Sequence, residues 1–180
     1  MRTLEGKTAL VTGGGKGIGR AIALALSARG VRVVVTGRQE RALGETVGEI
    51  AHGGGKARHL AGDVRDPAHL AAAVGRAVDV FGGLDLVIAN AWEPGSPSTN
   101  IEGADGTFKA AIAQMAGPGR LVIVSRGEPG AALAALVARR QADLEDRKIT
   151  CDCVVVGAGE AEEVVGQRVV ALCGVWAASS

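Results

Sequence analysis

The sequence predicts an α/β fold in which a doubly wound parallel sheet of about six strands is covered by helices on both faces, giving three layers. Two observations support this prediction. Short runs rich in β-branched residues alternate with longer helical stretches along all 180 residues, and a run near the centre, 84–90, is almost entirely apolar. Alternation of this kind forms parallel sheets with right-handed crossovers, whose inner strands are buried on both faces. No linker or repeat divides the chain, so we expect a single domain over residues 1–180.

The first half of the chain contains three predicted strand–helix units. The first strand runs into a glycine-rich turn, and Gly30 follows the first helix at a position where glycine commonly ends helices. Asp66 and Pro67 have the residue types of an N-cap and of a first helical position. The predicted strands are 8–12, 31–36 and 57–61, and the predicted helices are 17–29, 40–50 and 66–81.

The second half of the chain continues this alternation. The apolar central strand is followed by a loop rich in Pro and Ser, and the last predicted helix is amphipathic. The predicted strands are 84–90, 121–125 and 149–156, and the predicted helices are 100–115, 131–146 and 161–177.

The charge and cysteine content exclude several classes of protein. Twenty Lys and Arg against nineteen Asp and Glu leave a net charge of +1, so neither nucleic acid nor a membrane is an expected partner. Every apolar run is too short to span a bilayer, and the first residues lack the pattern of a signal peptide. Three cysteines do not make a disulfide framework, and Cys151 and Cys153 lack the further ligands of a metal site. We therefore expect a cytoplasmic protein that holds no metal.

The turn after the first strand has the composition of a phosphate-binding loop. Residues 12–19 read T-G-G-G-K-G-I-G, in a chain that contains 28 glycines. Glycines let the backbone bend sharply and approach a pyrophosphate, and the helix that follows offers free N–H groups and its positive dipole end. The expected cofactor contacts in this turn are Gly13, Gly15, Lys16, Gly17, Ile18 and Gly19.

The glycine spacing T-G-x-x-x-G-x-G resembles that of the short-chain dehydrogenase/reductase family, and further resemblances follow in chain order. Gly62-Asp63-Val64 resembles the family's adenine-contacting pair, and Ala89-Asn90-Ala91-Trp92 resembles its N-N-A-G motif. Asn100 resembles the Asn of the catalytic set, 119–125 the fifth strand and 162–164 the E-E-V of the last helix. The resemblance implies a Rossmann fold with strand order 3-2-1-4-5-6. It also implies a nicotinamide dinucleotide that further contacts Asp63, Val64, Asn90 and Ala91.

The residues after the second strand favour NADP(H) over NAD(H). A site for NAD has an acidic side chain there to accept a hydrogen bond from the ribose 2′-hydroxyl. This chain has Thr36-Gly37-Arg38 instead, and the Arg38 guanidinium suits a 2′-phosphate. Lys16 supplies a second positive charge, and in the family this pairing implies NADP(H). The alternative interpretation is that both cations are ordinary solvated surface residues.

The catalytic residues that the resemblance would require are largely missing. A family reductase uses a Tyr hydroxyl, with its pKa lowered by a Lys, and a Ser hydroxyl to stabilise the developing alkoxide. This chain has no tyrosine, and the Ser position falls on Arg126, beside Ser125. When residues 136–140 are placed in register with the family's Tyr and Lys, Leu136 stands at the Tyr position and Arg140 at the Lys position. The remaining catalytic candidates are Asn100 and Ser125, although an Asn at a helix start is often only an N-cap.

Other parts associated with the substrate are also reduced. Trp92 stands where the family has a Gly near the nicotinamide, and the substrate-covering segment expected after Gly157 is absent. The favoured hypothesis is therefore an NADP(H)-binding protein without catalysis, acting as a partner subunit of an oxidoreductase. The alternatives are an active reductase with an unusual proton donor and an enzyme of non-redox chemistry. By resemblance, the helices near 100–115 and 131–146 would form the interface of a homo- or hetero-oligomer.

Overall fold

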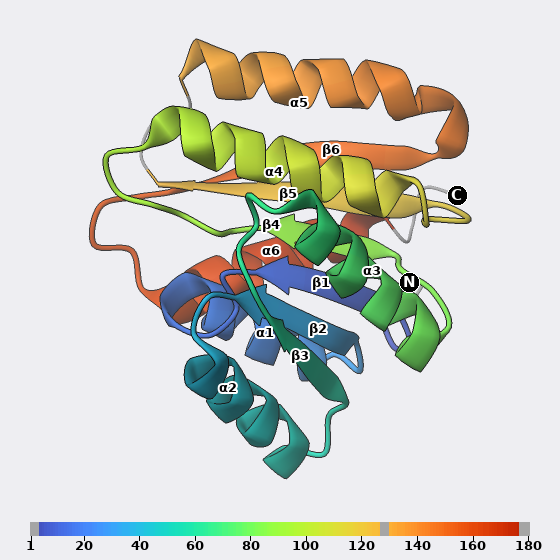
Figure 1. Ribbon diagram of the computed structural model, residues 1–180, viewed down its shortest axis with the longest axis vertical. Coiled ribbons are helices and arrows are strands. Elements are labelled where there is room, and N and C mark those ends of the chain that lie inside the picture. The colour runs from blue at the N-terminus through green and yellow to red at the C-terminus, as the bar shows by residue number, and fades with distance from the viewer. Residues whose placement is uncertain (1–3, 127–129, 177–180) are drawn as a thin grey trace.

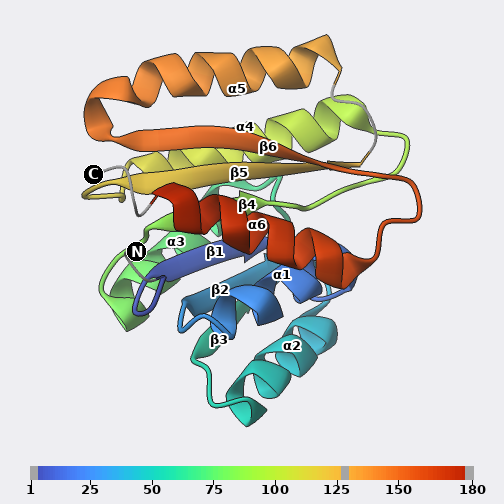
Figure 2. The same ribbon diagram turned by 180° about the vertical axis from the view of Figure 1, so that it is seen from behind.

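The computed structural model describes residues 4–126 and 130–176, which form a six-stranded parallel sheet between two layers of helices. The strand order is β3-β2-β1-β4-β5-β6, so the predicted doubly wound Rossmann arrangement is confirmed. Figures 1 and 2 show the two faces of this sheet. The strands are β1 (Thr8–Thr12), β2 (Arg32–Gly37), β3 (Ala57–Ala61), β4 (Leu86–Ala89), β5 (Gly119–Arg126) and β6 (Ile149–Val156).

Three helices cover each face of the sheet. Helices α1, α2 and α6 lie on one face, and α3, α4 and α5 lie on the other (Figures 1 and 2). The helices are α1 (Gly17–Ser27), α2 (Glu40–His52), α3 (Pro67–Phe81), α4 (Pro97–Ile112), α5 (Ala131–Leu144) and α6 (Glu162–Trp176), with a short 3₁₀ turn at Glu145–Arg147.

Each face has its own hydrophobic core, because successive strand residues point to opposite sides of the sheet. In β1, Val11 belongs to the core under α1 and α6, whereas its neighbour Leu10 belongs to the core under α3 and α4. Nearly every residue of the inner strands is buried. This agrees with the apolar runs that predicted them.

The boundaries of several elements differ from the prediction. Strand β4 is confined to Leu86–Ala89, and β5 is longer than expected at both ends. Helix α4 begins at Pro97, so Asn100 lies within its first turns and is not the residue that opens the helix. The sequence contains a local reason for this start, because proline is favoured at the first helical position.

Two predicted helix signals are present as expected. Asp66 caps α3 by accepting a hydrogen bond from the N–H of Ala68 at 2.9 Å. Gly30 has a φ of +78°, a backbone conformation that favours glycine. Within the described part of the chain, no helix has the length and apolarity that a bilayer span requires.

A partly buried ion pair joins the two outermost strands on the β5–β6 side of the sheet. The Arg120 guanidinium donates to an Asp152 carboxylate oxygen at 2.9 Å, and the Arg120 side chain is only 7% exposed. These residues come from β5 and from the edge strand β6. The pair therefore adds a side-chain ion pair to the backbone hydrogen bonds that hold the edge strand β6 against β5.

Candidate nucleotide-binding site

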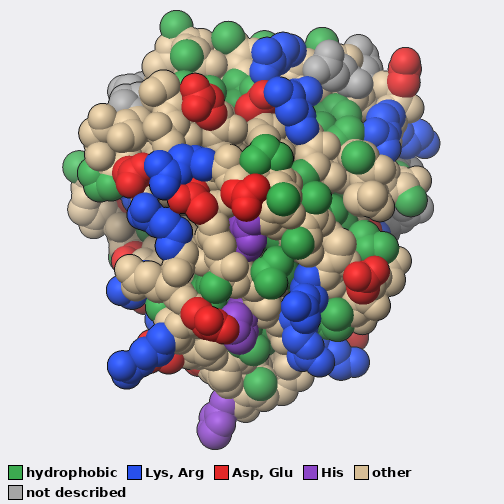
Figure 3. Space-filling model, in the orientation of Figure 1, with side chains coloured by type: hydrophobic (Ala, Val, Ile, Leu, Met, Phe, Trp, Pro, Cys, Tyr) green, Lys and Arg blue, Asp and Glu red, His purple; other side chains and the backbone are tan. Residues whose placement is uncertain are grey.

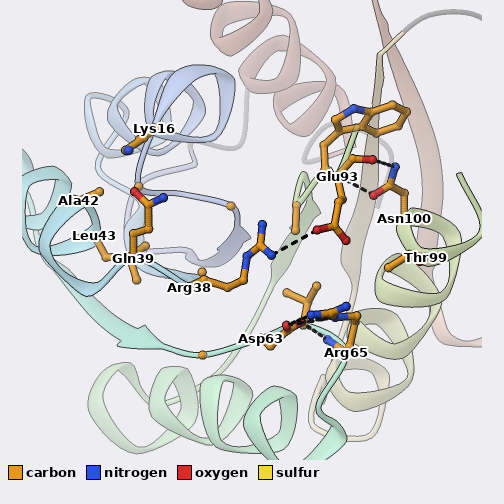
Figure 4. A pocket seen from close by; sticks show the side chains of 17 residues that line it. Lys16, Arg38, Gln39, Ala42, Leu43, Asp63, Arg65, Glu93, Thr99 and Asn100 are labelled. Atoms are coloured by element: carbon orange, nitrogen blue, oxygen red, sulfur yellow. Dashed lines mark hydrogen bonds and ion pairs between the residues drawn. The ribbon is translucent and has the colours of Figure 1, made fainter. Parts of the chain in front are cut away.

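A pocket of about 240 Å³ lies at the carboxyl ends of the strands. It begins at the turn after β1 and extends beside the ends of β2 and β3 to the loop after β4 (Figure 4). In doubly wound sheets, ligands bind at this edge, where the strand order reverses between β1 and β4. The described lining residues are Gly13, Gly15, Lys16, Gly37, Arg38, Gln39, Ala42, Leu43, Gly62, Asp63, Val64, Arg65, Ala91, Trp92, Glu93, Thr99 and Asn100.

Three glycines of the turn after β1 cannot be replaced by larger residues without strain or overlap. Gly13 and Gly17 have φ values of +65° and +53°, which favour glycine. A Cβ on Gly19 would overlap the carbonyl oxygen of Gly13. The turn therefore brings its backbone close to whatever occupies the pocket, and no described side chain caps the N-terminus of α1 that follows. This cradle suits a phosphate group.

The six residues predicted to bind a cofactor in this turn fall into two groups. Gly13, Gly15 and Lys16 line the pocket. The Ile18 side chain is 7% exposed and belongs to the core on the α1 side of the sheet. Gly17 and Gly19 lie at the start of α1 and are absent from the described pocket lining. Their contribution to the pocket is the shape of the turn.

The Asn90 side chain is hydrogen-bonded to the backbone of the glycine turn. Its Nδ2 donates to the carbonyl oxygens of Thr12 and Gly13, and its own N–H donates to the Thr12 hydroxyl at 3.0 Å. The side chain is buried, and its Oδ1 has no hydrogen-bond partner among the described residues. Asn90 thus holds β4 against the turn, while the adjacent Ala91 lines the pocket.

Positive side chains gather on the β2 and β3 side of the pocket. Arg38 follows β2 and is 61% exposed, and Lys16 lies in the glycine turn at another part of the same pocket (Figure 4). The Arg38 guanidinium is 3.3 Å from a carboxylate oxygen of Glu93, which comes from the loop after β4. Arg38 therefore points across the mouth of the pocket and is held there by a weak, solvent-accessible ion pair.

Asp63 lines the pocket and is already engaged by Arg65. The Asp63 carboxylate accepts hydrogen bonds from the Arg65 backbone N–H at 2.9 Å and from the guanidinium Nε at 3.0 Å. These hydrogen bonds lower the pKa of Asp63 to about 2, so the carboxylate is charged at neutral pH. Val64, between them, also lines the pocket.

The structure does not bring the two catalytic candidates together in the pocket. Asn100 lines the pocket, and its side chain forms two hydrogen bonds with the backbone of Glu93. Ser125 is buried in β5 and does not occur in the described pocket lining. By strand alternation, Ser125 faces the same side as Ile123, which belongs to the core under α4 and α5.

Arg126 lies against Trp92, a residue that lines the pocket. Arg126 ends β5, and its guanidinium carbon lies 5.8 Å from the centre of the Trp92 ring, within the range of a cation–π contact. Burial lowers the pKa of Arg126, although an arginine remains charged at any ordinary pH. Glu162, at the start of α6, is an attractive charge for the same guanidinium.

The sequence prediction missed several residues of this pocket. Gln39, Arg65, Glu93 and Thr99 all line it. The proximity of Arg65 to Asp63 was a usable signal, because residues two apart after a strand lie at the same edge. Glu93 gave no such signal, since it meets Arg38 across 55 positions of sequence.

Comparisons with known proteins support this description of the fold. A profile of the family described as short chain dehydrogenase matches residues 7–116. Versicolorin reductase stcU of Emericella nidulans is 47% identical over 89 residues, which is 49% of this chain and 34% of that protein. Ketoacyl reductase HetN of Nostoc is 41% identical over 91 residues, which is 51% of this chain and 32% of that protein. The matched segment thus spans about a third of these curated relatives.

Solved structures resemble this chain over most of its length. A short chain dehydrogenase from Burkholderia cenocepacia, in complex with NADP, has a TM-score of 0.83 and 26% identity, covering 98% of this chain and 94% of that one. A metagenomic short-chain oxidoreductase in complex with NADP has a TM-score of 0.82 and 24% identity, covering 94% and 91%.

Proposed function

Because the chain belongs to the short-chain dehydrogenase family, we propose that it binds NADP(H) in the pocket described above and serves as a non-catalytic partner subunit of an oxidoreductase. One observation carries the second part of this proposal. The chain contains no tyrosine, and β5 ends in the cation Arg126 rather than in a hydroxyl. The nicotinamide of such a dinucleotide supplies a hydride, but the alkoxide formed from a ketone also needs a positioned proton donor.

The residues in register with the family's Tyr and Lys have structural partners elsewhere. Leu136 is buried in the core under α5. Arg140 donates from Nε to an Asp105 carboxylate oxygen at 2.9 Å, which ties α5 to α4. Neither residue belongs to the described pocket lining. These contacts support a structural role for both residues.

Arg38 and Lys16 support the choice of NADP(H). Both line one pocket next to the glycine turn, where a ribose 2′-phosphate would bring about two negative charges within reach of them. The backbone of the glycine cradle is available for polar contacts with the rest of the nucleotide. Two structural neighbours were crystallised with NADP, which agrees with this assignment.

The test of nucleotide binding is a calorimetric titration with NADPH and with NADH. We expect NADPH to bind more tightly, and Arg38→Gln to weaken NADPH binding by about 10- to 100-fold, as expected for the loss of one charged hydrogen-bonding group. The matched control is Arg41→Gln, which removes a nearby arginine in the first turn of α2. The Arg41 side chain is 93% exposed and pairs with Glu45. Equal affinity for NADH and NADPH would contradict the proposed cofactor.

The test of catalysis is NADPH oxidation in the presence of a panel of ketones and aldehydes. We expect binding without turnover. Turnover would overturn the non-catalytic proposal and favour a reductase whose proton donor is a water or a substrate group. Ser125→Ala and Asn100→Ala would then show which of the two side chains holds that donor.

The outer surfaces of α4 and α5 are the proposed interface with another subunit. The exposed residues of the first turns of α5 are mostly alanines, and this face carries apolar side chains interspersed with charged ones (Figure 3). Small side chains permit close approach of a second helix pair. Light scattering, alone and with a full-length family member, tests this proposal. A monomer in both conditions would contradict it.

A further inference from the structure

The described pocket does not reach the ends of β5 and β6. Its lining comes from the glycine turn, the ends of β2 and β3, the loop after β4 and the first turn of α4. The described residues at the ends of β5 and β6 contribute nothing to it. A dinucleotide on a doubly wound sheet occupies both sides of the switch point, with one mononucleotide on each. Among the described residues, the lining crosses the switch point as far as the loop after β4 and the start of α4, and none of it comes from the ends of β5 and β6; we call the lined part the open side and the β5–β6 part the closed side.

Trp92 forms the end wall of this pocket. The indole lines the pocket, and the half-buried Arg126 guanidinium lies 5.8 Å from its ring centre. A cation held over an aromatic face restrains both groups, because electrostatic attraction to the ring offsets part of the hydration that the guanidinium loses on burial. The ring therefore separates the open side of the crevice from the ends of β5 and β6.

Glu162 places a negative charge on the closed side. One of its carboxylate oxygens lies 3.1 Å from the position that a Cβ on Gly17 would occupy, so it sits next to the phosphate-binding turn. It also attracts Arg126. A diphosphate that continued from the turn toward β5 and β6 would approach this carboxylate, and like charges at that distance repel. Trp92 in the loop after β4, Arg126 in β5 and Glu162 in α6 thus lie together on the β5–β6 side of the pocket.

The open side carries more positive than negative charge. Lys16, Arg38 and Arg65 line the pocket there, and the two carboxylates of the described lining, Asp63 and Glu93, are paired with Arg65 and Arg38.

We propose that this chain recognises nucleotides by their adenosine 2′-phosphate half alone, and that Trp92, with Arg126 and Glu162, excludes the nicotinamide half from the crevice. The inference rests on the proposed NADP(H) binding and narrows it. The ligand class is any nucleotide with an adenosine 2′-phosphate and a 5′-phosphate, whatever group the 5′-phosphate carries. The nicotinamide of bound NADPH then remains in solvent.

Calorimetry with the full chain tests this proposal by comparing NADPH, NADP⁺ and adenosine 2′,5′-bisphosphate. We expect all three dissociation constants to agree within about threefold, because the nicotinamide half adds no contact. The fluorescence of the dihydronicotinamide should be unchanged on binding. NADPH binding that is tighter than the bisphosphate by about tenfold or more, or an enhanced and blue-shifted fluorescence, overturns this inference and leaves the proposed cofactor intact. Binding of none of the three overturns both.

A pair of variants tests the end wall itself. Trp92→Gly removes the ring, and we expect NADPH to gain about tenfold in affinity relative to adenosine 2′,5′-bisphosphate, with a blue-shifted dihydronicotinamide fluorescence. Trp92→Phe is the matched control, because it keeps an aromatic ring in front of Arg126 and should leave the affinity ratio unchanged. An unchanged ratio in Trp92→Gly, with a native circular dichroism spectrum, contradicts the role assigned to Trp92. The comparison of ligands on the unmodified chain is independent of how either variant folds.

Discussion

Asn100 holds the backbone of Glu93 by both of its polar groups. The Asn100 Oδ1 accepts from the Glu93 N–H at 2.8 Å, and its Nδ2 donates to the Glu93 carbonyl at 3.1 Å. Both bonds go to backbone atoms, so they fix the loop after β4 and leave the Glu93 carboxylate free to reach Arg38 (Figure 4). The role supported for Asn100 is that of a positioning residue for this loop.

Asn100→Ala should therefore destabilise the protein. Two backbone groups of Glu93 lose their partners, which is expected to lower the free energy of unfolding by about 1–2 kcal/mol and to speed hydrogen exchange at the Glu93 amide. Urea unfolding and exchange measurements test both effects. The control is Thr99→Ala, which truncates the adjacent pocket residue and leaves both hydrogen bonds in place. Equal losses in the two variants would refute the positioning role.

Glu93→Gln should tighten NADPH binding. Glu93 competes with a 2′-phosphate for Arg38, and an exposed pair of this kind is worth about 0.2–1 kcal/mol, so the affinity should rise up to about fivefold. The affinity for NADH, which has no such phosphate, should stay the same. Glu45→Gln, which removes the partner of Arg41 outside the pocket, is the control. The gain should shrink at high ionic strength, and a gain that is independent of salt would argue against competition.

Gly19→Ala and Gly48→Ala should have opposite effects on stability. A Cβ at position 19 overlaps the Gly13 carbonyl oxygen, so the turn must shift, at a cost of about 1–3 kcal/mol and with weaker nucleotide binding. A Cβ at position 48, within α2, meets nothing within 4 Å. That substitution should stabilise the chain by about 0.4–1 kcal/mol, because alanine restricts the unfolded state. Urea unfolding of both variants measures the difference, and similar effects would contradict the close approach in the turn.

Asp152→Ala should be strongly destabilising. It leaves the Arg120 guanidinium, whose side chain is 7% exposed, without its carboxylate partner. Breaking a fully buried pair typically costs about 3–5 kcal/mol, and the partial exposure of Asp152 reduces the expected loss to about 2–4 kcal/mol. Asp152→Asn retains an acceptor oxygen and should recover part of this loss. Thermal or urea unfolding compares the two, and a loss below about 0.5 kcal/mol for alanine would show that the pair is not structural.

Cys151 and Cys173 should be unreactive in the folded protein near neutral pH. Burial raises the pKa of each thiol to about 12, so at pH 8 the thiolate fraction is about a thousandfold lower than for a thiol of pKa near 9. Because the native state retains these protons longer than the unfolded state, their contribution to stability is present below about pH 9 and is lost as the pH rises toward 12. Labelling with a thiol reagent, followed by peptide mapping, should modify both only after unfolding in urea. Rapid labelling at pH 8 would contradict their burial.

The sequence was sufficient to predict the sheet, because the signals that define it are local. The apolar run near 84–90 and the glycine turn after the first strand each lie within a few consecutive residues. They predicted the parallel sheet and the position of the pocket at its carboxyl edge. The Asp66 cap was likewise predicted from two adjacent residues.

The relationships across the pocket could not be predicted in this way. Arg38 and Glu93 are 55 residues apart, and no periodic pattern relates a loop after β2 to a loop after β4. The role of Asn100 depends on where α4 begins. The helix starts three residues before the predicted position, so Asn100 does not cap it and instead forms hydrogen bonds with the preceding loop. The partner of Arg140 depends on the packing of α5 against α4, which only the folded chain defines.

The position of Trp92 determines what a bound nucleotide can report. NADP⁺ and NADPH differ only in the nicotinamide ring, at the opposite end of the molecule from the 2′-phosphate. If the pocket ends at this indole, as proposed, it has no contact that distinguishes NADP⁺ from NADPH. Conversion of one into the other then leaves the fraction of occupied pockets unchanged. Occupancy then follows the total concentration of the coenzyme and is insensitive to its oxidation state. A subunit built in this way would measure the size of the coenzyme pool.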